Sequence, residues 1–197
     1  MPTVDSCNRW LLAALVVLLA SCSGFYETRP GELYRDRQPS EDELSRNIER
    51  YNLQTIVLLR GLSEDTVPSR RAAWAANIDF VRISISAQSL PPPEKLLQLW
   101  ETIDQAERPI LFHCRAGVDR TGLAMAMALL HDTGDLEEAR GQLVLLPYGH
   151  VGIGTSAMTE LFDLYEPWHG RMEFPVWVRE IYTRQYAGED VPPPAES

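Results

Sequence analysis

Two kinds of hydrophobic pattern alternate along the chain. Apolar runs of roughly four to eight residues are typical of buried β-strands, whereas apolar residues repeated every three to four positions are typical of amphipathic helices. The first pattern predicts strands at residues 53–60 and 109–114, and the alternation of apolar and polar residues at 79–86 predicts a third strand. The second predicts helices at residues 41–51, 67–78, 91–107, 121–132, 136–146, 155–168 and 173–186.

Local sequence supports this division. Ser40 precedes Glu43 by three residues, which is the spacing of a capping box and predicts a helix that begins at residue 41. Because strands and helices alternate, we expect an α/β fold with a central, largely parallel sheet flanked by helices. We expect this domain to span residues 33–185 and a disordered tail to occupy residues 186–197.

The N-terminal segment carries a separate pattern. Residues 10–20 are eleven consecutive apolar residues, which is short of the roughly 20 needed to span a membrane but suits the core of a secretory signal. The sequence Leu19-Ala20-Ser21-Cys22 follows and resembles a bacterial lipobox. The alternative is a buried helix that happens to contain a cysteine.

The lipobox resemblance implies a location. It implies that residues 1–21 are a lipoprotein signal peptide and that Cys22 is lipidated. Residues 22–32 would then be a lipidated tether that anchors the protein on the periplasmic side of the bacterial cell envelope. Ser23, rather than an aspartate, favours the outer membrane.

Composition limits the classes of function. The formal net charge of −10 argues against a nucleic-acid partner, because a surface that follows phosphates needs an excess of basic residues. The four histidines are scattered and form no metal-ligand pair, so we expect no metal site and no cofactor. If Cys7 and Cys22 belong to the processed segment, Cys114 is the thiol that remains, and it is either inert core or reactive.

The sequence HCRAGVDRTG, residues 113–122, places Cys114 between a predicted strand and a predicted helix. Such a turn binds anions, because its backbone N–H groups point inward and the helix N-terminus adds positive potential that stabilises a thiolate. Gly117 and Gly122 permit tight curvature, and Arg120 offers a bidentate fork to a phosphate. The predicted phosphate-binding residues are Arg115, Ala116, Gly117, Val118, Asp119 and Arg120.

Two residues of this stretch, Cys114 and Thr121, have further predicted catalytic roles, and His113 has a supporting one. Cys114 is the expected nucleophile and Thr121 is expected to hydrogen-bond its sulfur. His113 is expected to order the loop through hydrogen bonds rather than to touch the substrate.

The stretch resembles the H-C-x5-R-[ST] signature of cysteine-dependent protein tyrosine phosphatases, in their dual-specificity-like bacterial and fungal branch. The segments LYRDRQPS, TIVLLRG and YGHVGIGTSAM also resemble that branch, and the similarity covers about residues 33–183. It implies a phosphocysteine intermediate, no metal, and an aspartate that protonates the leaving oxygen.

That aspartate is absent from its usual place. The region SISAQSLPPPEK, residues 84–95, contains no Asp. Asp119 is the leading candidate for the general acid, with Asp79 and Asp65 as fallbacks. Asp119 alternatively orders the loop without transferring a proton.

The expected function is hydrolysis of phosphate monoesters, with a phosphorylated protein or a small phosphoester as the partner. One alternative is an envelope lipoprotein that binds phosphate without catalysis. A redox or sulfur-transfer enzyme is a further alternative, but no resolving cysteine remains.

Overall fold

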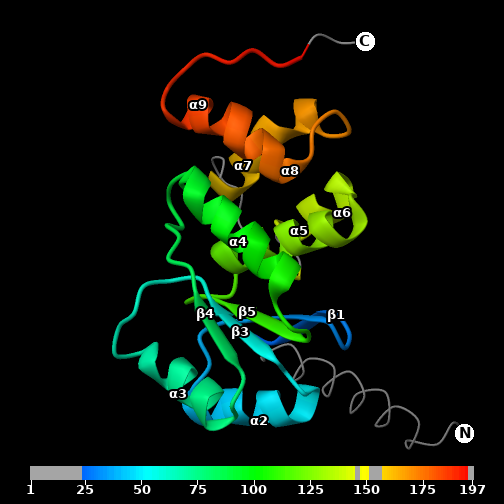
Figure 1. Ribbon diagram of the computed structural model, residues 1–197. Coiled ribbons are helices and arrows are strands. Elements are labelled where there is room, and N and C mark those ends of the chain that lie inside the picture. Colours follow the sequence, from blue (N-terminus) through cyan, green and yellow to red (C-terminus); the bar gives the residue numbers. More distant parts are fainter. Residues whose placement is uncertain (1–23, 145–146, 151–156, 195–197) are drawn as a thin grey trace, which may run out of the picture.

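The computed structural model describes residues 24–144, 147–150 and 157–194. Its centre is a five-stranded sheet in the order β1-β2-β5-β3-β4, in which only the β1–β2 pair is antiparallel. The α/β fold with a largely parallel sheet is therefore confirmed (Figure 1). The strands are β1 (Tyr26–Arg29), β2 (Leu33–Asp36), β3 (Thr55–Leu58), β4 (Asp79–Arg82) and β5 (Ile110–His113).

Helices cover both faces of the sheet (Figure 1). Below it in the view lie α2 (Glu41–Tyr51) and α3 (Val67–Ala75). Above it lie α4 (Pro93–Gln105) and α5 (Asp119–Thr133), and a further layer covers these two. α6 (Leu136–Arg140) lies beside α5, and the further layer contains α7 (Ala157–Tyr165), η1 (Glu166–Trp168), α8 (Phe174–Trp177), η2 (Val178–Tyr182) and α9 (Thr183–Tyr186).

The helix signals in the sequence have identifiable outcomes. The Ser40 side chain accepts from the Glu43 backbone N–H and the Glu43 side chain accepts from the Ser40 N–H, so the capping box is confirmed and α2 begins at the predicted residue. Residues 121–130 of α5 are all buried, because this helix lies between the sheet and the outer layer. Among the helices of the described residues, none is long and apolar enough to cross a membrane.

The expected tether is wrong for residues 26–29. They form the edge strand β1, which pairs antiparallel with β2. Phe25 stacks on Tyr51 and Tyr34, with ring centroids 4.7 and 5.5 Å apart, so burial of aromatic surface holds this segment on the domain. The folded domain therefore begins before residue 33. Residues 1–21 and Cys22 lie outside the described residues.

The C-terminal boundary is close to the predicted one. α9 ends at Tyr186, and the described residues beyond 188 contain no helix or strand. Val191 nevertheless packs against the main core. This contact places at least one residue of the expected tail on the folded domain.

Strand β2 was not predicted from the sequence. All four of its residues are buried, although two of them, Arg35 and Asp36, carry charge. Strand alternation places Leu33 and Arg35 on the α5 face, and Tyr34 and Asp36 on the α2 face. Because Arg35 and Asp36 are polar, the segment lacks the apolar run that is typical of a buried strand. Their burial places two ionisable side chains near the end of β5, where the candidate site lies.

Candidate active site

The HCRAGVDRTG stretch forms a loop between the middle strand of the sheet and the central helix. β5 lies between β2 and β3 and ends at His113, and α5 begins at Asp119. Ligands of parallel α/β sheets bind at the carboxyl ends of the strands, which is where this loop lies. The predicted strand–loop–helix arrangement is therefore present.

Cys114 lies at the base of the loop. Its side chain is 2% exposed, and its sulfur accepts a hydrogen bond from the Gly117 backbone N–H at 3.3 Å. Gly117 has a φ of +73°, and a Cβ atom added there would lie 2.7 Å from the Arg37 backbone nitrogen. Glycine is thus required for both the backbone conformation and the close approach of the loop to the end of β2.

The loop holds a set of unused hydrogen-bond donors. The N–H groups of residues 115, 116, 118, 119 and 120 form no hydrogen bond within the described part of the chain. Arg120 forms no ion pair with any described residue, and its Nε is buried without a partner. Buried donors without partners are unfavourable unless a ligand satisfies them, and these donors suit the oxygens of a phosphate.

Strand β2 and the residues just after it hold the loop in place. Arg35 donates from Nη2 to the carbonyl oxygens of Gly117 and Val118, at 3.0 and 3.2 Å. The Gln38 backbone N–H donates to the Arg115 carbonyl at 3.1 Å. Sequence reasoning did not assign a role to Arg35. Its only signal was the resemblance of LYRDRQPS to the phosphatase branch.

Asp119 is held by a histidine from a distant segment. Its Oδ1 lies 2.8 Å from Nδ1 of His150, while Nε2 of His150 lies 3.2 Å from the Thr159 hydroxyl. The His150 side chain is 1% exposed and the Asp119 side chain 38%. The pairing favours a role of Asp119 in ordering the loop, and it leaves one side of the carboxyl open to solvent.

His113 and Thr121 have no hydrogen-bond partner in the described chain that meets normal geometry. Burial lowers the pKa of His113 to about 4, against a smaller upward contribution from the Cys114 backbone, so the imidazole is neutral. Among the described residues, the expected side-chain hydrogen bonds of His113 are not formed. The Thr121 hydroxyl is fully buried and does not contact the sulfur of Cys114 within hydrogen-bond distance.

Gly122 is required by packing. A Cβ atom added there would lie 2.9 Å from a Leu143 methyl group and 3.0 Å from the Gln142 carbonyl oxygen. The start of α5 therefore packs tightly against the segment after α6. This contact positions the helix N-terminus behind the loop.

The two fallback acids are poorly placed for proton transfer. Asp79 pairs in register with Thr55, which pairs with Ile110, so it lies two strands from β5 and is offset from Cys114 by about 13 Å along the strand direction, at the opposite end of the sheet. Asp65 accepts hydrogen bonds from Ser63 and Arg60, and these lower its pKa. A carboxyl that is held ionised is a weak proton donor. Asp119 remains the best-placed candidate.

Asp36 is a titratable group that the sequence did not reveal. It is 5% exposed, and burial raises its pKa to about 7, opposed by the backbone N–H and charge of Arg37. Its carboxyl faces the α2 side of the sheet, while its backbone carbonyl and the Arg37 backbone nitrogen lie against Gly117.

We expect Asp36→Asn to flatten the pH dependence of stability. A raised pKa favours the folded state below the unfolded pKa of about 4, and this contribution is lost as the pH rises to about 7. Wild type should therefore lose about 1 kcal/mol of unfolding free energy per pH unit in this window from Asp36 alone. Urea denaturation at pH 5, 6 and 7 measures the slope. Glu64→Gln, at an exposed position, is the control, and an equal slope in wild type and Asp36→Asn would contradict the assignment.

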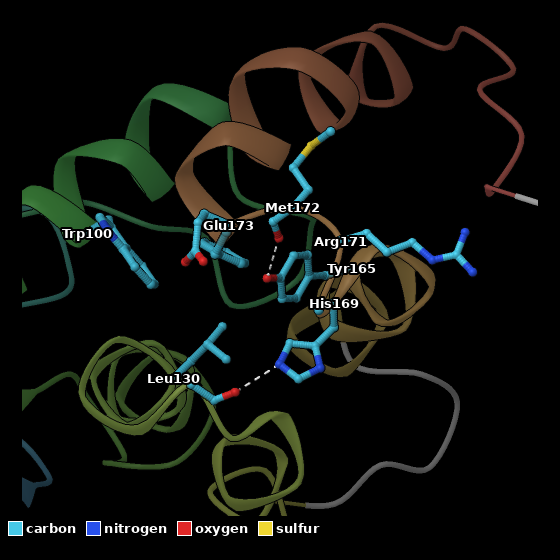
Figure 2. A pocket seen from close by; sticks show the side chains of 10 residues that line it. Trp100, Leu130, Tyr165, His169, Arg171, Met172 and Glu173 are labelled. Atoms are coloured by element: carbon cyan, nitrogen blue, oxygen red, sulfur yellow. Dashed lines mark hydrogen bonds between the residues drawn. The ribbon is translucent and has the colours of Figure 1, made fainter. Parts of the chain in front are cut away.

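A cavity of about 380 Å³ lies at the other end of α5 (Figure 2). Trp100, Leu130, Tyr165 and Phe174 line it, together with the turn after η1. The His169 side chain reaches the Gly134 carbonyl across it, and the Tyr165 hydroxyl donates to the Met172 carbonyl. No residue of the HCRAGVDRTG loop lines this cavity, so it is separate from the candidate site.

Within the described residues, no three His, Cys, Asp or Glu side chains are grouped so that they could hold a metal ion. The loop donors described above are backbone N–H groups and a guanidinium, which bind anions rather than cations. The chemistry of the site is therefore that of an anion-binding loop around a cysteine.

Solved structures with the same fold include phosphatases. TpbA from P. aeruginosa, in complex with pTyr, is 20% identical, with a TM-score of 0.57 and coverage of 71% of this chain and 83% of that chain. The core catalytic domain of the PP-IP phosphatase SIW14 from S. cerevisiae, in complex with citrate, is 22% identical, with a TM-score of 0.54 and coverage of 72% and 85%. A putative phosphatase (DUF442) from Shewanella putrefaciens CN-32 is 18% identical, with a TM-score of 0.58 and coverage of 79% and 97%. At these identities the likeness establishes the fold.

No curated protein sequence matches the chain significantly. One family model does match, over residues 24–147, which is more than half of the chain. Its description is PTP-NADK, a DSP-PTPase phosphatase fused to NAD+ kinase. The matched range contains all five strands and the complete HCRAGVDRTG loop. By sequence and fold, the chain belongs to this family of cysteine-based, dual-specificity-like protein tyrosine phosphatases.

Proposed function

We propose that this protein hydrolyses phosphate monoesters through a phosphocysteine intermediate on Cys114. One observation carries the proposal: five backbone N–H groups and the Arg120 guanidinium, all without partners in the described chain, surround a cysteine whose sulfur accepts a hydrogen bond. Donors arranged in this way match the three non-bridging oxygens of a phosphoryl group.

The reaction has two steps. In the first, the Cys114 thiolate attacks phosphorus, an S–P bond forms, and the ester oxygen leaves and takes up a proton. In the second, water attacks phosphorus, the S–P bond breaks, and the thiolate and inorganic phosphate are released. The Gly117 N–H, 3.3 Å from the sulfur, stabilises the thiolate at both ends of the cycle.

Trapping the intermediate tests this proposal. The full chain is mixed with an aryl phosphate in EDTA, quenched in acid after a few milliseconds, and digested for mass spectrometry. We expect turnover that survives EDTA and a phosphate adduct on the peptide that contains Cys114. Turnover without an adduct on that peptide would contradict the mechanism. If phosphate protects the Cys114 thiol from alkylation but no turnover is detected, the protein binds phosphate without catalysis, which is the alternative function.

Asp119 is proposed as the proton donor to the leaving oxygen. Its position beside the loop and its partial exposure support this role, and its hydrogen bond with His150 supports the alternative, a purely ordering role. The two roles differ in how the rate depends on the leaving group. A general acid matters most for alkoxide leaving groups and little for phenolates that leave without protonation.

We expect Asp119→Asn to slow alkyl phosphate hydrolysis by about 10²-fold and to slow p-nitrophenyl phosphate hydrolysis much less. Asparagine keeps the hydrogen bond to His150 in one orientation but carries no transferable proton. Measured kcat values for both substrates test the prediction. His150→Gln is the matched variant, since it disturbs the pair without removing the carboxyl. Equal losses for both leaving groups in Asp119→Asn would assign Asp119 to ordering alone.

The substrate class proposed is a phosphorylated protein or small phosphoester. Phosphotyrosine is the first compound to assay, because TpbA, which shares the fold, was solved with pTyr bound.

The membrane location is also a proposal, which rests on the LASC sequence at residues 19–22. Labelling of cells with a palmitate precursor should mark wild type and not Cys22→Ala. Equal labelling and equal membrane association of both would contradict the lipid anchor.

A further inference from the structure

Arg35 is a buried charged side chain without a carboxylate partner in the described part of the chain. It is 0% exposed, and its four hydrogen bonds go to neutral oxygens: the carbonyls of Gly117, Val118 and Gln142 and the side-chain oxygen of Gln142. Its guanidinium carbon lies 3.9 Å from the centre of the Tyr148 ring. Burying a charge is unfavourable, and an apolar side chain of similar volume is often at least as stabilising. Packing alone therefore does not account for an arginine here.

The guanidinium remains charged in this position. Burial lowers the pKa of Arg35 to about 10, and nearby Tyr148, Cys114 and Tyr26 oppose that shift. A negative charge on Cys114 therefore attracts the guanidinium. The attraction is mutual, because any effect of the thiolate on Arg35 has an equal effect in the other direction.

The hydrogen bonds of Arg35 also set the direction of the loop amides. In a planar trans peptide, the C=O and the following N–H point in opposite directions. Since Arg35 holds the carbonyls of Gly117 and Val118, the N–H groups of Val118 and Asp119 point away from it. Those two N–H groups are among the five without a partner in the described chain.

β2 supplies this side chain in register with the strand that carries the nucleophile. Arg35 pairs with Phe112 in the parallel β2–β5 ladder, two residues before Cys114. Nη1 of the same guanidinium anchors the Gln142 segment, and the ring of Tyr148 lies across its face. One side chain thus connects the sheet, the loop and the segment after α6.

We propose that Arg35 is a positioning residue for the phosphatase reaction: it turns the Val118 and Asp119 N–H groups toward the phosphate and stabilises the Cys114 thiolate from beneath the loop. This rests on the proposed function, but two of its consequences are measurable without turnover. They are the pH midpoint at which Cys114 is alkylated, and the concentration of inorganic phosphate that protects Cys114 from alkylation.

The experiment compares wild type, Arg35→Met and Arg35→Lys as full chains. Iodoacetamide labelling between pH 4 and pH 10 is quantified by mass spectrometry on the peptide that contains Cys114, with and without inorganic phosphate. Thermal unfolding is measured in parallel. Arg29→Met is the matched control, because Arg29 also forms hydrogen bonds from the sheet but to Glu32 and to Asp132 at the far end of α5.

For Arg35→Met we expect the alkylation midpoint to rise and phosphate protection to weaken about tenfold. For Arg35→Lys we expect the midpoint to stay near that of wild type, because the charge is kept. Phosphate protection should still weaken in Arg35→Lys, because an ammonium does not reproduce the fork. Arg29→Met should change stability without changing either readout.

A folded Arg35→Met protein with the wild-type midpoint and wild-type phosphate protection would overturn the proposal. If Arg35→Met fails to fold, Arg35→Lys decides: unchanged phosphate protection in that variant overturns it, and weakened protection supports it. Absence of turnover in wild type would contradict the proposed function but would leave these two readouts intact. The failure of one proposal is thereby distinguishable from the failure of the other.

Discussion

Cys114→Ser is expected to reduce phosphate ester hydrolysis by about 10⁴-fold or more while the protein still binds phosphate. Serine keeps the size of the side chain, but its hydroxyl does not ionise near neutral pH, and the hydrogen bond at this position in the described chain comes from a backbone N–H, which cannot take its proton. The donors proposed to hold the phosphate are the N–H groups of residues 115, 116, 118, 119 and 120 and the Arg120 guanidinium, so the substitution leaves them in place.

Two measurements are needed for Cys114→Ser. Steady-state assays with an aryl phosphate give the loss of kcat, and isothermal titration with inorganic phosphate or vanadate gives the binding constant. A thermal unfolding midpoint close to that of wild type would show that this buried position, which is 2% exposed, tolerates serine. Residual turnover of even one per cent that persists through repurification would show that Cys114 is not the nucleophile.

Arg120→Lys is expected to lower kcat/KM by about 10³-fold. The guanidinium has no ion-pair partner among the described residues, so its fork is available to two phosphate oxygens. Lysine keeps the charge but donates from one nitrogen and loses the planar, two-pronged geometry, which matters most as charge builds on the oxygens in the transition state.

The control for Arg120→Lys is Arg82→Lys. Arg82 is exposed, lies at the carboxyl end of β4, and forms no ion pair within the described chain. Both variants keep the positive charge at this edge of the sheet, so a difference between them reflects the position of the guanidinium and not its charge. A loss confined to Arg120→Lys assigns the effect to its fork, whereas unchanged kcat/KM in Arg120→Lys would remove that residue from the site.

Burial shifts the pKa values of two neighbouring residues of β2 in opposite directions. Arg35 and Asp36 lie on opposite faces of one buried strand, and burial lowers the pKa of the first to about 10 and raises that of the second to about 7. The strand therefore places a permanent charge on the loop side and a carboxyl that titrates near neutral pH on the α2 side. This separation predicts that Asp36 affects stability with pH, whereas Arg35 affects the reactivity of Cys114.

Local sequence was sufficient for the fold class and for the loop. Periodicity located the three predicted strands and the start of α2, because the spacing of apolar residues and the Ser40–Glu43 capping box are local properties. The order His113, Cys114 and Arg120, with glycines at 117 and 122, predicted a strand–loop–helix turn because the curvature and the donors come from consecutive residues. The missing upstream Asp was also visible in the sequence.

Tertiary structure decided what surrounds that loop. The sequence interpretation treated residues 26–29 as a tether, missed strand β2 and gave no partner to Asp119, because all three depend on contacts between segments far apart in the chain. Nothing local shows that Arg35 is buried beneath residues 117 and 118, or that His150 reaches Asp119 over 31 positions. The anion-binding loop is thus a property of ten consecutive residues, whereas its orientation and electrostatics arise from side chains that only the folded sheet and helices bring together.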